Sequence, residues 1–151
     1  MRVVTWNINS VRLRINSVKK VVKKLDPDIL CLQETKCLKE DFPFEDFEKM
    51  GFVDTGAIGI KGYNGVCIAS RHPITSIDKH IFFNKDDARH MNIEFLYKNK
   101  KIIIHNFYVP AGGDEPDPKI NAKFKHKLKF LEEATKLFSN KKSAKNDLVV
   151  L

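Results

Sequence analysis

The chain has 151 residues and a mass of 17.4 kDa, a size typical of one domain. Hydrophobic residues make up 42% and charged residues 30% of it, which excludes disordered, collagen-like and coiled-coil proteins. No apolar run approaches the roughly 18 residues that a membrane helix needs, so we expect a soluble protein with no membrane partner. The first residues lead directly into a strand-like run without an apolar signal core, and we therefore expect a cytoplasmic protein.

The positive charge is concentrated in two segments. The chain has 27 Lys and Arg against 19 Asp and Glu, a net charge of +8. Residues 1–25 hold seven basic side chains and no acid, and residues 119–145 hold nine Lys against two Glu. Such segments favour a phosphate-rich partner. For residues 119–145, a solvated helix face explains the lysines equally well.

The three cysteines form no close CxxC pair, which predicts neither a disulfide framework nor a zinc site. Cys31 and Cys67 lie inside apolar runs, where we expect small buried thiols. A reducing compartment suits this pattern.

The first part of the chain alternates strands and helices. Residues 2–8 alternate as a strand does, and apolar residues then recur at helical spacing over 15–25. Pro27 ends that helix. Residues 29–33 are almost continuously apolar, as in a strand buried on both faces, and residues 41–50 predict a short helix.

The period then changes to two, which predicts a run of strands. We expect them at 52–58, 65–71, 74–82, 89–97 and 101–107, arranged as a meander and joined by turns rich in Gly, Asn, Asp and Pro. A long loop follows over 109–118, then a helix over 120–138 and a strand-like run at 148–151.

Polar side chains follow three of the predicted strands. Asn7 and Asn9 follow the first, Glu34 follows the strand at 29–33, and Tyr108 opens the long loop. Open sheets present their ligands at such strand ends, and a carboxylate directly after a buried strand has to be hydrated, hydrogen-bonded or bound to a cation. Taken separately, each cluster also fits an ordinary strand end with turn-forming residues.

Four motifs carry a resemblance to a known family. They are Trp6-Asn7-Ile8-Asn9, Leu32-Gln33-Glu34-Thr35-Lys36, Gly62-Tyr63-Asn64-Gly65-Val66 and Asn106-Phe107-Tyr108-Val109-Pro110. In order and spacing the chain resembles the N-terminal half of exonuclease III type apurinic/apyrimidinic endonucleases, in the endonuclease/exonuclease/phosphatase superfamily.

This resemblance implies an α/β fold: half of a four-layer α/β/β/α sandwich of the deoxyribonuclease I type, with a mixed, mostly antiparallel sheet and flanking helices. Residues 1–151 are then the N-terminal part of one domain, truncated just before the family's Gly-Asp-x-Asn motif. We expect the chain to supply one sheet and its helices, plus the first strand or so of the other half. The inner face of that sheet should then be apolar and uncovered, which would promote self-association.

The resemblance also implies a Mg²⁺-dependent hydrolase of base excision repair. Its activities are cleavage at abasic sites and 3′-5′ exodeoxyribonuclease III activity, on double-stranded DNA with abasic sites or 3′ ends. We expect this chain alone to be inactive, because the later Asp and His residues of the family lie outside it. The alternatives are a non-catalytic DNA-binding or interaction fragment, and another phosphodiesterase or phosphatase of the superfamily.

The resemblance assigns roles residue by residue. Glu34 is implied as a ligand of Mg²⁺, with Mn²⁺ as the alternative metal, and Asn7 as a nearby ligand or catalytic hydrogen-bonding group. Tyr108 is implied as a catalytic hydrogen-bond donor to the phosphate. The implied DNA-binding residues are Arg12, Tyr63, Arg89, Asn9, Asn64 and Lys36. The alternatives are structural roles: a salt bridge with Lys36 for Glu34, a strand-end hydrogen bond for Asn7 and core packing for Tyr108. For Arg89, an ion pair with Asp86 or Asp87 is the alternative.

Overall fold

A computed structural model of the chain describes residues 1–84, 86–139 and 147–150. Lys85, in the turn expected near 84–87, and Leu151, at the end of the last expected strand, lie outside the described residues. The chain forms two compact units, Met1–Tyr108 with Asp147–Leu151, and Val109–Asn146.

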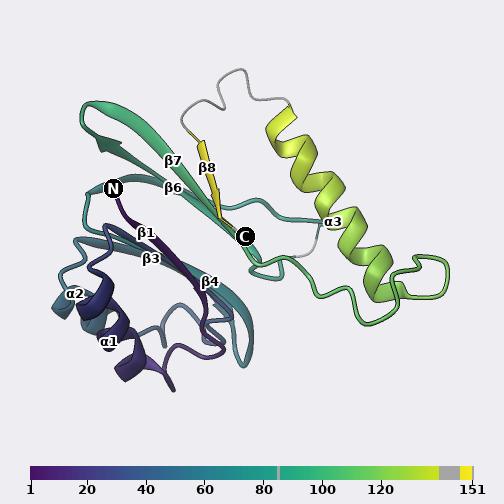
Figure 1. The fold of residues 1–151 in the computed structure, drawn as a ribbon, viewed down its shortest axis with the longest axis horizontal. Helices are drawn as coiled ribbons and strands as arrows, with labels where there is room; N and C mark the ends of the chain where they lie inside the picture. The colour runs from purple at the N-terminus through teal and green to yellow at the C-terminus, as the bar shows by residue number, and fades with distance from the viewer. Residues whose placement is uncertain (85, 140–146, 151) are drawn as a thin grey trace. The chain divides into compact units, whose positions relative to one another are not determined.

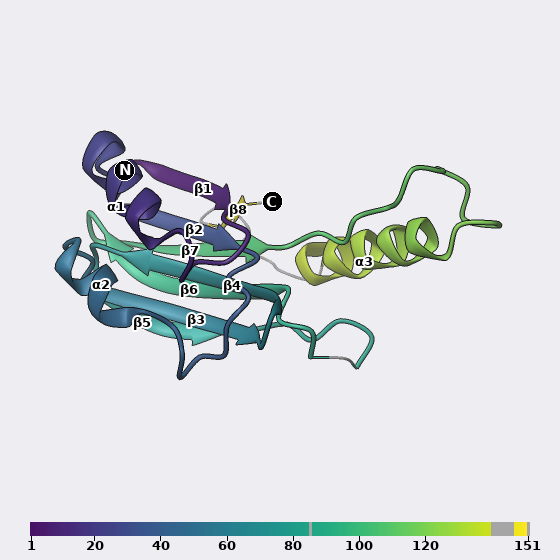
Figure 2. The ribbon, with the colours of Figure 1, turned by 90° about the horizontal axis from the view of Figure 1, so that it is seen from below.

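The first sheet contains β1 (Val3–Asn7), β2 (Ile29–Gln33), β4 (Tyr63–Ser70) and β3 (Asp54–Ile60), side by side in that order (Figure 2). β1 and β2 are parallel, and α1 (Ile15–Leu25) connects them, as a parallel pair requires. The other pairs are antiparallel.

The ends of α1 follow from the sequence. Asp26 adopts a left-handed φ of 44°, and its N–H donates to the Val22 carbonyl at 2.8 Å. Pro27 follows, and the helix predicted at 15–25 is confirmed.

Two helices cover one face of this sheet (Figure 1). Val18 and Val22 of α1 and Phe47 of α2 (Phe44–Lys49) are buried against apolar side chains of β2, including Leu30. The predicted helix at 41–50 is shorter in the structure, because Pro43 stands at its N-cap.

The second sheet contains β5 (Ile74–Asp78), β6 (His90–Tyr97), β7 (Lys100–Phe107) and β8 (Asp147–Val150), in that order. β5, β6 and β7 pair antiparallel, whereas β8 is parallel to β7.

The predicted single meander is wrong, because the chain changes sheets between β4 and β5. The backbone N–H of Arg71 donates to the Asp28 carbonyl at 2.9 Å, and that of Ile74 donates to the Asp54 carboxylate at 2.8 Å. Because both N–H groups bond to other segments of the first sheet and its loops, β4 and β5 do not form a hairpin.

The two sheets pack face to face, with β6 and β7 on the side of the first sheet opposite α1 and α2 (Figure 1). The layer between them is built from apolar side chains of both sheets, namely Ile29, Cys31, Val66, Ile68, Met91, Ile93, Phe95 and Ile104. The expectation of one sheet with an uncovered inner face is therefore wrong. The strands after Pro73 assemble a second sheet that buries this face, which removes the proposed basis for self-association. The α/β class with mixed, mostly antiparallel sheets and flanking helices is confirmed.

The other unit contains α3 (Ala122–Ser139), close to the predicted helix at 120–138. Asn121 caps it: its side-chain oxygen accepts the N–H groups of Lys123 at 3.0 Å and Phe124 at 3.2 Å. Its amide nitrogen donates to the Gly112 carbonyl at 2.9 Å, which ties the preceding loop to the helix start. Across the described residues, no helix is both long and apolar enough to cross a membrane.

Candidate active site

The site is built where β2 ends. Glu34 follows the last residue of that strand with a left-handed φ of 56°, and Lys36 has a φ of 53°. Such backbone is costly for residues other than glycine and persists where neighbouring structure holds it. Here the Glu34 carbonyl accepts the N–H of Ser10 at 2.7 Å, and the N–H of Lys36 donates to the Asn64 carbonyl at 2.8 Å. Loops after β1, after β2 and at the start of β4 are thereby joined.

The Glu34 carboxylate receives hydrogen bonds from three side chains. The Asn7 amide nitrogen donates to Oε1 at 2.8 Å, and the Tyr108 hydroxyl donates to the same oxygen at 2.9 Å. The Lys36 ammonium lies 3.0 Å from Oε2. The structure thus brings together four of the residues predicted for the site.

These contacts determine the charge of Glu34. Burial raises the pKa of the Glu34 carboxyl, but the hydrogen bonds from Asn7, Lys36 and Tyr108 and the Lys36 charge outweigh burial, so the pKa lies below its ordinary value. Glu34 is therefore an anion at neutral pH.

Tyr108 is shifted in the opposite sense. Burial is the largest cause, the hydrogen bond to Glu34 and the Glu34 charge add to it, and the net effect raises the pKa of the Tyr108 hydroxyl in spite of the nearby Arg89. Tyr108 therefore keeps its proton at neutral pH and acts as a hydrogen-bond donor.

Arg89 contacts both the ring and the backbone of Tyr108. Its guanidinium lies 4.7 Å from the centre of the Tyr108 ring, and its Nη1 donates to the Tyr108 carbonyl at 3.2 Å. Its Nε pairs with Asp87 at 2.6 Å, and the Arg89 side chain is only 9% exposed. The ion pair that the sequence left as an alternative is therefore present, and a DNA contact by Arg89 stays a prediction.

Asn64 lies close to this pair and is also buried, at 2% exposure. Its amide donates to the Asp87 carbonyl at 2.7 Å, and its φ of 47° turns the chain into β4. It holds the loop that carries Asp87, and its predicted contact with DNA is not tested by this geometry.

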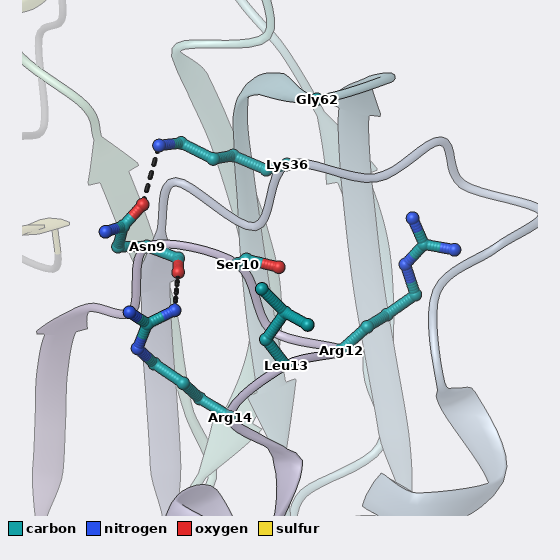
Figure 3. A pocket seen from close by; sticks show the side chains of 7 residues that line it. All are labelled: Asn9, Ser10, Arg12, Leu13, Arg14, Lys36 and Gly62. Atoms are coloured by element: carbon teal, nitrogen blue, oxygen red, sulfur yellow. Dashed lines mark hydrogen bonds between the residues drawn. The ribbon is translucent and has the colours of Figure 1, made fainter.

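A hollow of about 650 Å³ shares Lys36 with this site (Figure 3). Its lining is Asn9, Ser10, Arg12, Leu13, Arg14, Lys36 and Gly62. The Lys36 ammonium donates to the Asn9 side-chain oxygen at 2.6 Å, and Arg14 donates to the Asn9 carbonyl. Figure 3 shows Lys36 and Arg14 both reaching Asn9, with Arg12 extending away from them.

The exposed residues at this hollow suit contact with a charged partner. The Arg12 side chain is 50% exposed and lies 4.0 Å from Asp41, and Tyr63, next to Gly62, is 54% exposed. Arg14 lines the same hollow but was not among the predicted DNA-binding residues. The sequence pattern that could have indicated it is the Arg-x-Arg spacing with Arg12, in the turn that precedes the first helix.

The donor atoms at Glu34 suit a hard divalent cation. Oε1 of Glu34 already accepts two hydrogen bonds, and Oε2 accepts one from Lys36. Two oxygen atoms can therefore still bind a cation: Oε2 of Glu34 and the side-chain oxygen of Asn7. Mg²⁺ is commonly held by one or two carboxylates while it keeps several waters, so this donor set fits it. Over residues 1–84, 86–139 and 147–150, no group of three or more His, Cys, Asp or Glu could hold a metal.

The cysteines lie away from this chemistry. Cys31, Cys37 and Cys67 are buried free thiols, as expected for Cys31 and Cys67. Burial raises the pKa of Cys31 to about 12 and also raises the pKa of the other two. All three are therefore unreactive thiols at neutral pH.

Comparison with known proteins adds a family match. Residues 4–151 match the family described as Endonuclease/Exonuclease/phosphatase family. Exodeoxyribonuclease III of Haemophilus influenzae is 25% identical over 153 residues, which cover 100% of this chain and 56% of that protein.

Two solved structures are similar over most of the chain. An AP endonuclease from Archaeoglobus fulgidus has a TM-score of 0.85 and 30% identity, covering 99% of this chain and 55% of that one. A 3′ phosphatase, NExo from Neisseria bound to a product DNA hairpin, has a TM-score of 0.76 and 28% identity, covering 90% of this chain and 50% of that one. The chain thus spans about half the length of the relatives that it matches.

Proposed function

Because the chain belongs to the Endonuclease/Exonuclease/phosphatase family, we propose that it works in a Mg²⁺-dependent DNA repair phosphodiesterase that cleaves at abasic sites and degrades DNA from 3′ ends. The observation that carries this proposal is the joint hydrogen bonding of Glu34 by Asn7, Lys36 and Tyr108 at the motif positions. The family is one of divalent-metal-dependent nucleases, and its relatives include exodeoxyribonuclease III and AP endonucleases.

In this mechanism Glu34 and Asn7 would hold the cation, and a bound cation would supply charge neutralisation at the scissile phosphate. Tyr108 has one hydroxyl proton, which it donates to Glu34 in the structure. To bind a phosphate oxygen, it has to leave Glu34. We therefore infer that substrate binding transfers the Tyr108 hydrogen bond from the carboxylate to the phosphate.

The hollow that shares Lys36 with the site supplies the positive charge that holds the duplex. Arg12, Arg14 and Lys36 line it, and basic side chains at phosphates position DNA without reading its sequence. Tyr63, which follows the lining residue Gly62 in the chain, is exposed. Binding by these residues should weaken steeply as salt rises, because phosphate contacts release counterions.

We further propose that the 151-residue chain, assayed by itself, cleaves DNA very poorly. The described side chains in contact with Glu34 are an amide, an ammonium and a protonated phenol, and none of these is a base at neutral pH. Strong cleavage of an abasic duplex by this chain, dependent on Mg²⁺ and abolished by Glu34→Gln, would contradict this part of the proposal.

The function itself is tested with a chimera. This chain is fused to the part of the Archaeoglobus fulgidus AP endonuclease that lies outside the matched 55%. We expect Mg²⁺-dependent nicking at an abasic analogue and a loss of at least about 100-fold in Glu34→Gln. Loss of a side chain that only hydrogen-bonds to a metal ligand typically costs 10–100-fold, and Glu34 is proposed as a ligand itself.

A panel of substrates separates the related activities. An abasic duplex, a recessed 3′ end and a 3′-phosphate end are compared, the last because one structural neighbour is a 3′ phosphatase. A folded chimera that binds duplex DNA with a steep salt dependence but cleaves none of the three would favour a non-catalytic DNA-binding role instead.

The cytoplasm stays the expected compartment, since buried free thiols suit a reducing environment.

A further inference from the structure

Two buried amide side chains cross between the sheets directly behind the site. Asn106 of β7 is 0% exposed, and its nitrogen donates to the carbonyls of Leu32 at 3.0 Å and Cys67 at 2.9 Å, in β2 and β4 of the other sheet. Its side-chain oxygen accepts from the Gln33 amide at 2.6 Å. Gln33, 4% exposed, also donates to the Thr5 hydroxyl at 3.0 Å.

This pair uses its hydrogen-bonding capacity fully on the donor side. Each amide nitrogen has two protons, and both protons of Asn106 and both of Gln33 have acceptors. Leu32 and Cys67 are register partners in the β2–β4 ladder, so Asn106 binds both strands at one level. Apolar contacts alone permit one sheet to slide over the other, whereas these directional bonds specify a single register.

The two amides lie at the ends of their strands, next to the active-site residues. Gln33 immediately precedes Glu34, and Asn106 lies two residues before Tyr108. The bond from Tyr108 to Glu34 is itself a contact between segments that leave different sheets, 74 residues apart in the chain. A shift of the sheets by a fraction of an ångström would lengthen it.

We propose that the Gln33–Asn106 pair is a positioning device that holds Tyr108 against Glu34 by fixing the register of the two sheets. Its catalytic meaning rests on the proposed function, but its geometric effect does not. The hydrogen bonds of Gln33 and Asn106 go to each other, to the Thr5 hydroxyl and to two strand carbonyls, and neither residue lines the hollow. Both therefore act through the residues that follow them in the chain.

The test follows the Tyr108 hydroxyl in the 151-residue chain at one fixed, neutral pH. The protein is labelled with ¹³C-tyrosine, and the Tyr108 signal is assigned by its loss in Tyr108→Phe. In the unchanged chain, Glu34→Gln should shift the Tyr108 ring-carbon signal, because the hydroxyl donates to the Glu34 carboxylate. Asn106→Leu keeps the number and branching of the side-chain heavy atoms but removes all three bonds, and in that background Glu34→Gln should shift the signal much less.

Asn92→Leu is the matched control. Asn92 lies in β6, where Met91 and Ile93 face the other sheet, so by alternation it faces the opposite side. We expect Glu34→Gln to shift the Tyr108 signal in Asn92→Leu as far as in the unchanged chain.

A folded Asn106→Leu chain in which Glu34→Gln shifts the Tyr108 signal as far as in the unchanged chain would overturn the proposal. If Asn106→Leu does not fold, Gln33→Met decides, because it leaves the two bonds from Asn106 to the carbonyls in place. A partly reduced response of the Tyr108 signal to Glu34→Gln supports the proposal, and an unreduced response overturns it. Neither DNA nor cation takes part, so failure here would leave the nuclease proposal standing, and failure of the chimera to cleave would leave this result unaffected.

Discussion

The hydrogen bond from Tyr108 to Glu34 joins two segments of the site, and its free energy can be measured directly. Tyr108→Phe removes only the hydroxyl, which donates to Oε1 of Glu34 at 2.9 Å. The acceptor is charged at neutral pH, because the net effect of its surroundings lowers the pKa of Glu34. Tyr108→Phe should therefore destabilise the fold more than removal of a hydroxyl from a neutral acceptor would.

The magnitude follows from the type of bond. A hydrogen bond to a charged group contributes about 1.5–3 kcal/mol. The Glu34 side chain is 19% exposed, so solvent screens the bond in part and we expect about 1.5 kcal/mol, at the lower end of that range.

The dependence on pH has a definite sign. The folded-state pKa of Glu34 is depressed, so its contribution is present above the unfolded pKa of about 4.3 and is lost as pH falls through the folded pKa. The cost of Tyr108→Phe should accordingly shrink in acid.

A double-mutant cycle with Glu34→Gln isolates the pair. Urea unfolding at pH 7 of the unchanged chain, both single variants and the double variant should give a coupling of about 1 kcal/mol between Tyr108 and Glu34. Tyr97→Phe is the control, because the Tyr97 hydroxyl accepts from the Met1 amino group at 3.2 Å, and its coupling to Glu34→Gln should be near zero. Equal coupling for the two tyrosines would refute the reasoning.

Three further outcomes follow from particular contacts. Gly65→Ala should lower the melting temperature of the chain more than Gly62→Ala does. Both glycines have a positive φ, so both substitutions strain the backbone, but a Cβ at Gly65 would lie 2.2 Å from the Thr35 hydroxyl oxygen. A Cβ at Gly62 would meet nothing within 4 Å. Similar melting temperatures would contradict this. Arg89→Gln should lower the melting temperature by roughly 10 °C, because it leaves the Asp87 carboxylate, 12% exposed, without its cation at a cost of about 3–5 kcal/mol. A drop of less than about 2 °C would show that the pair is well solvated. The three cysteines should resist a thiol reagent at pH 8 in the folded chain and all react in denaturant, since burial raises their pKa values; fast labelling of the folded chain would count against the buried positions.

Local features of the fold were predictable because they depend on short stretches of sequence. The apolar period over residues 15–25 and the Asp26-Pro27 stop predicted α1 at its observed bounds. The continuous apolar run at 29–33 predicted β2 in the same way. These patterns reflect backbone hydrogen bonding and burial within one element, which adjacent residues encode.

Strand pairing was not predictable by the same means. A period of two at 74–107 is satisfied equally by one meander and by a second sheet packed on the first. The choice depends on which apolar face finds a partner across the core, and residues such as Phe95 meet that partner only in the folded chain.

By itself, the sequence determined the elements and the motifs, and with them the family and the chemistry of each side chain at the site. The tertiary structure decided which of these side chains meet. It pairs Arg89 with Asp87 and leaves Asp86 to Lys79, a choice that the sequence left open. It also brings Tyr108 to Glu34. The physical reason is distance along the chain: a contact across 74 residues depends on the packing of two sheets, which no short stretch of sequence encodes.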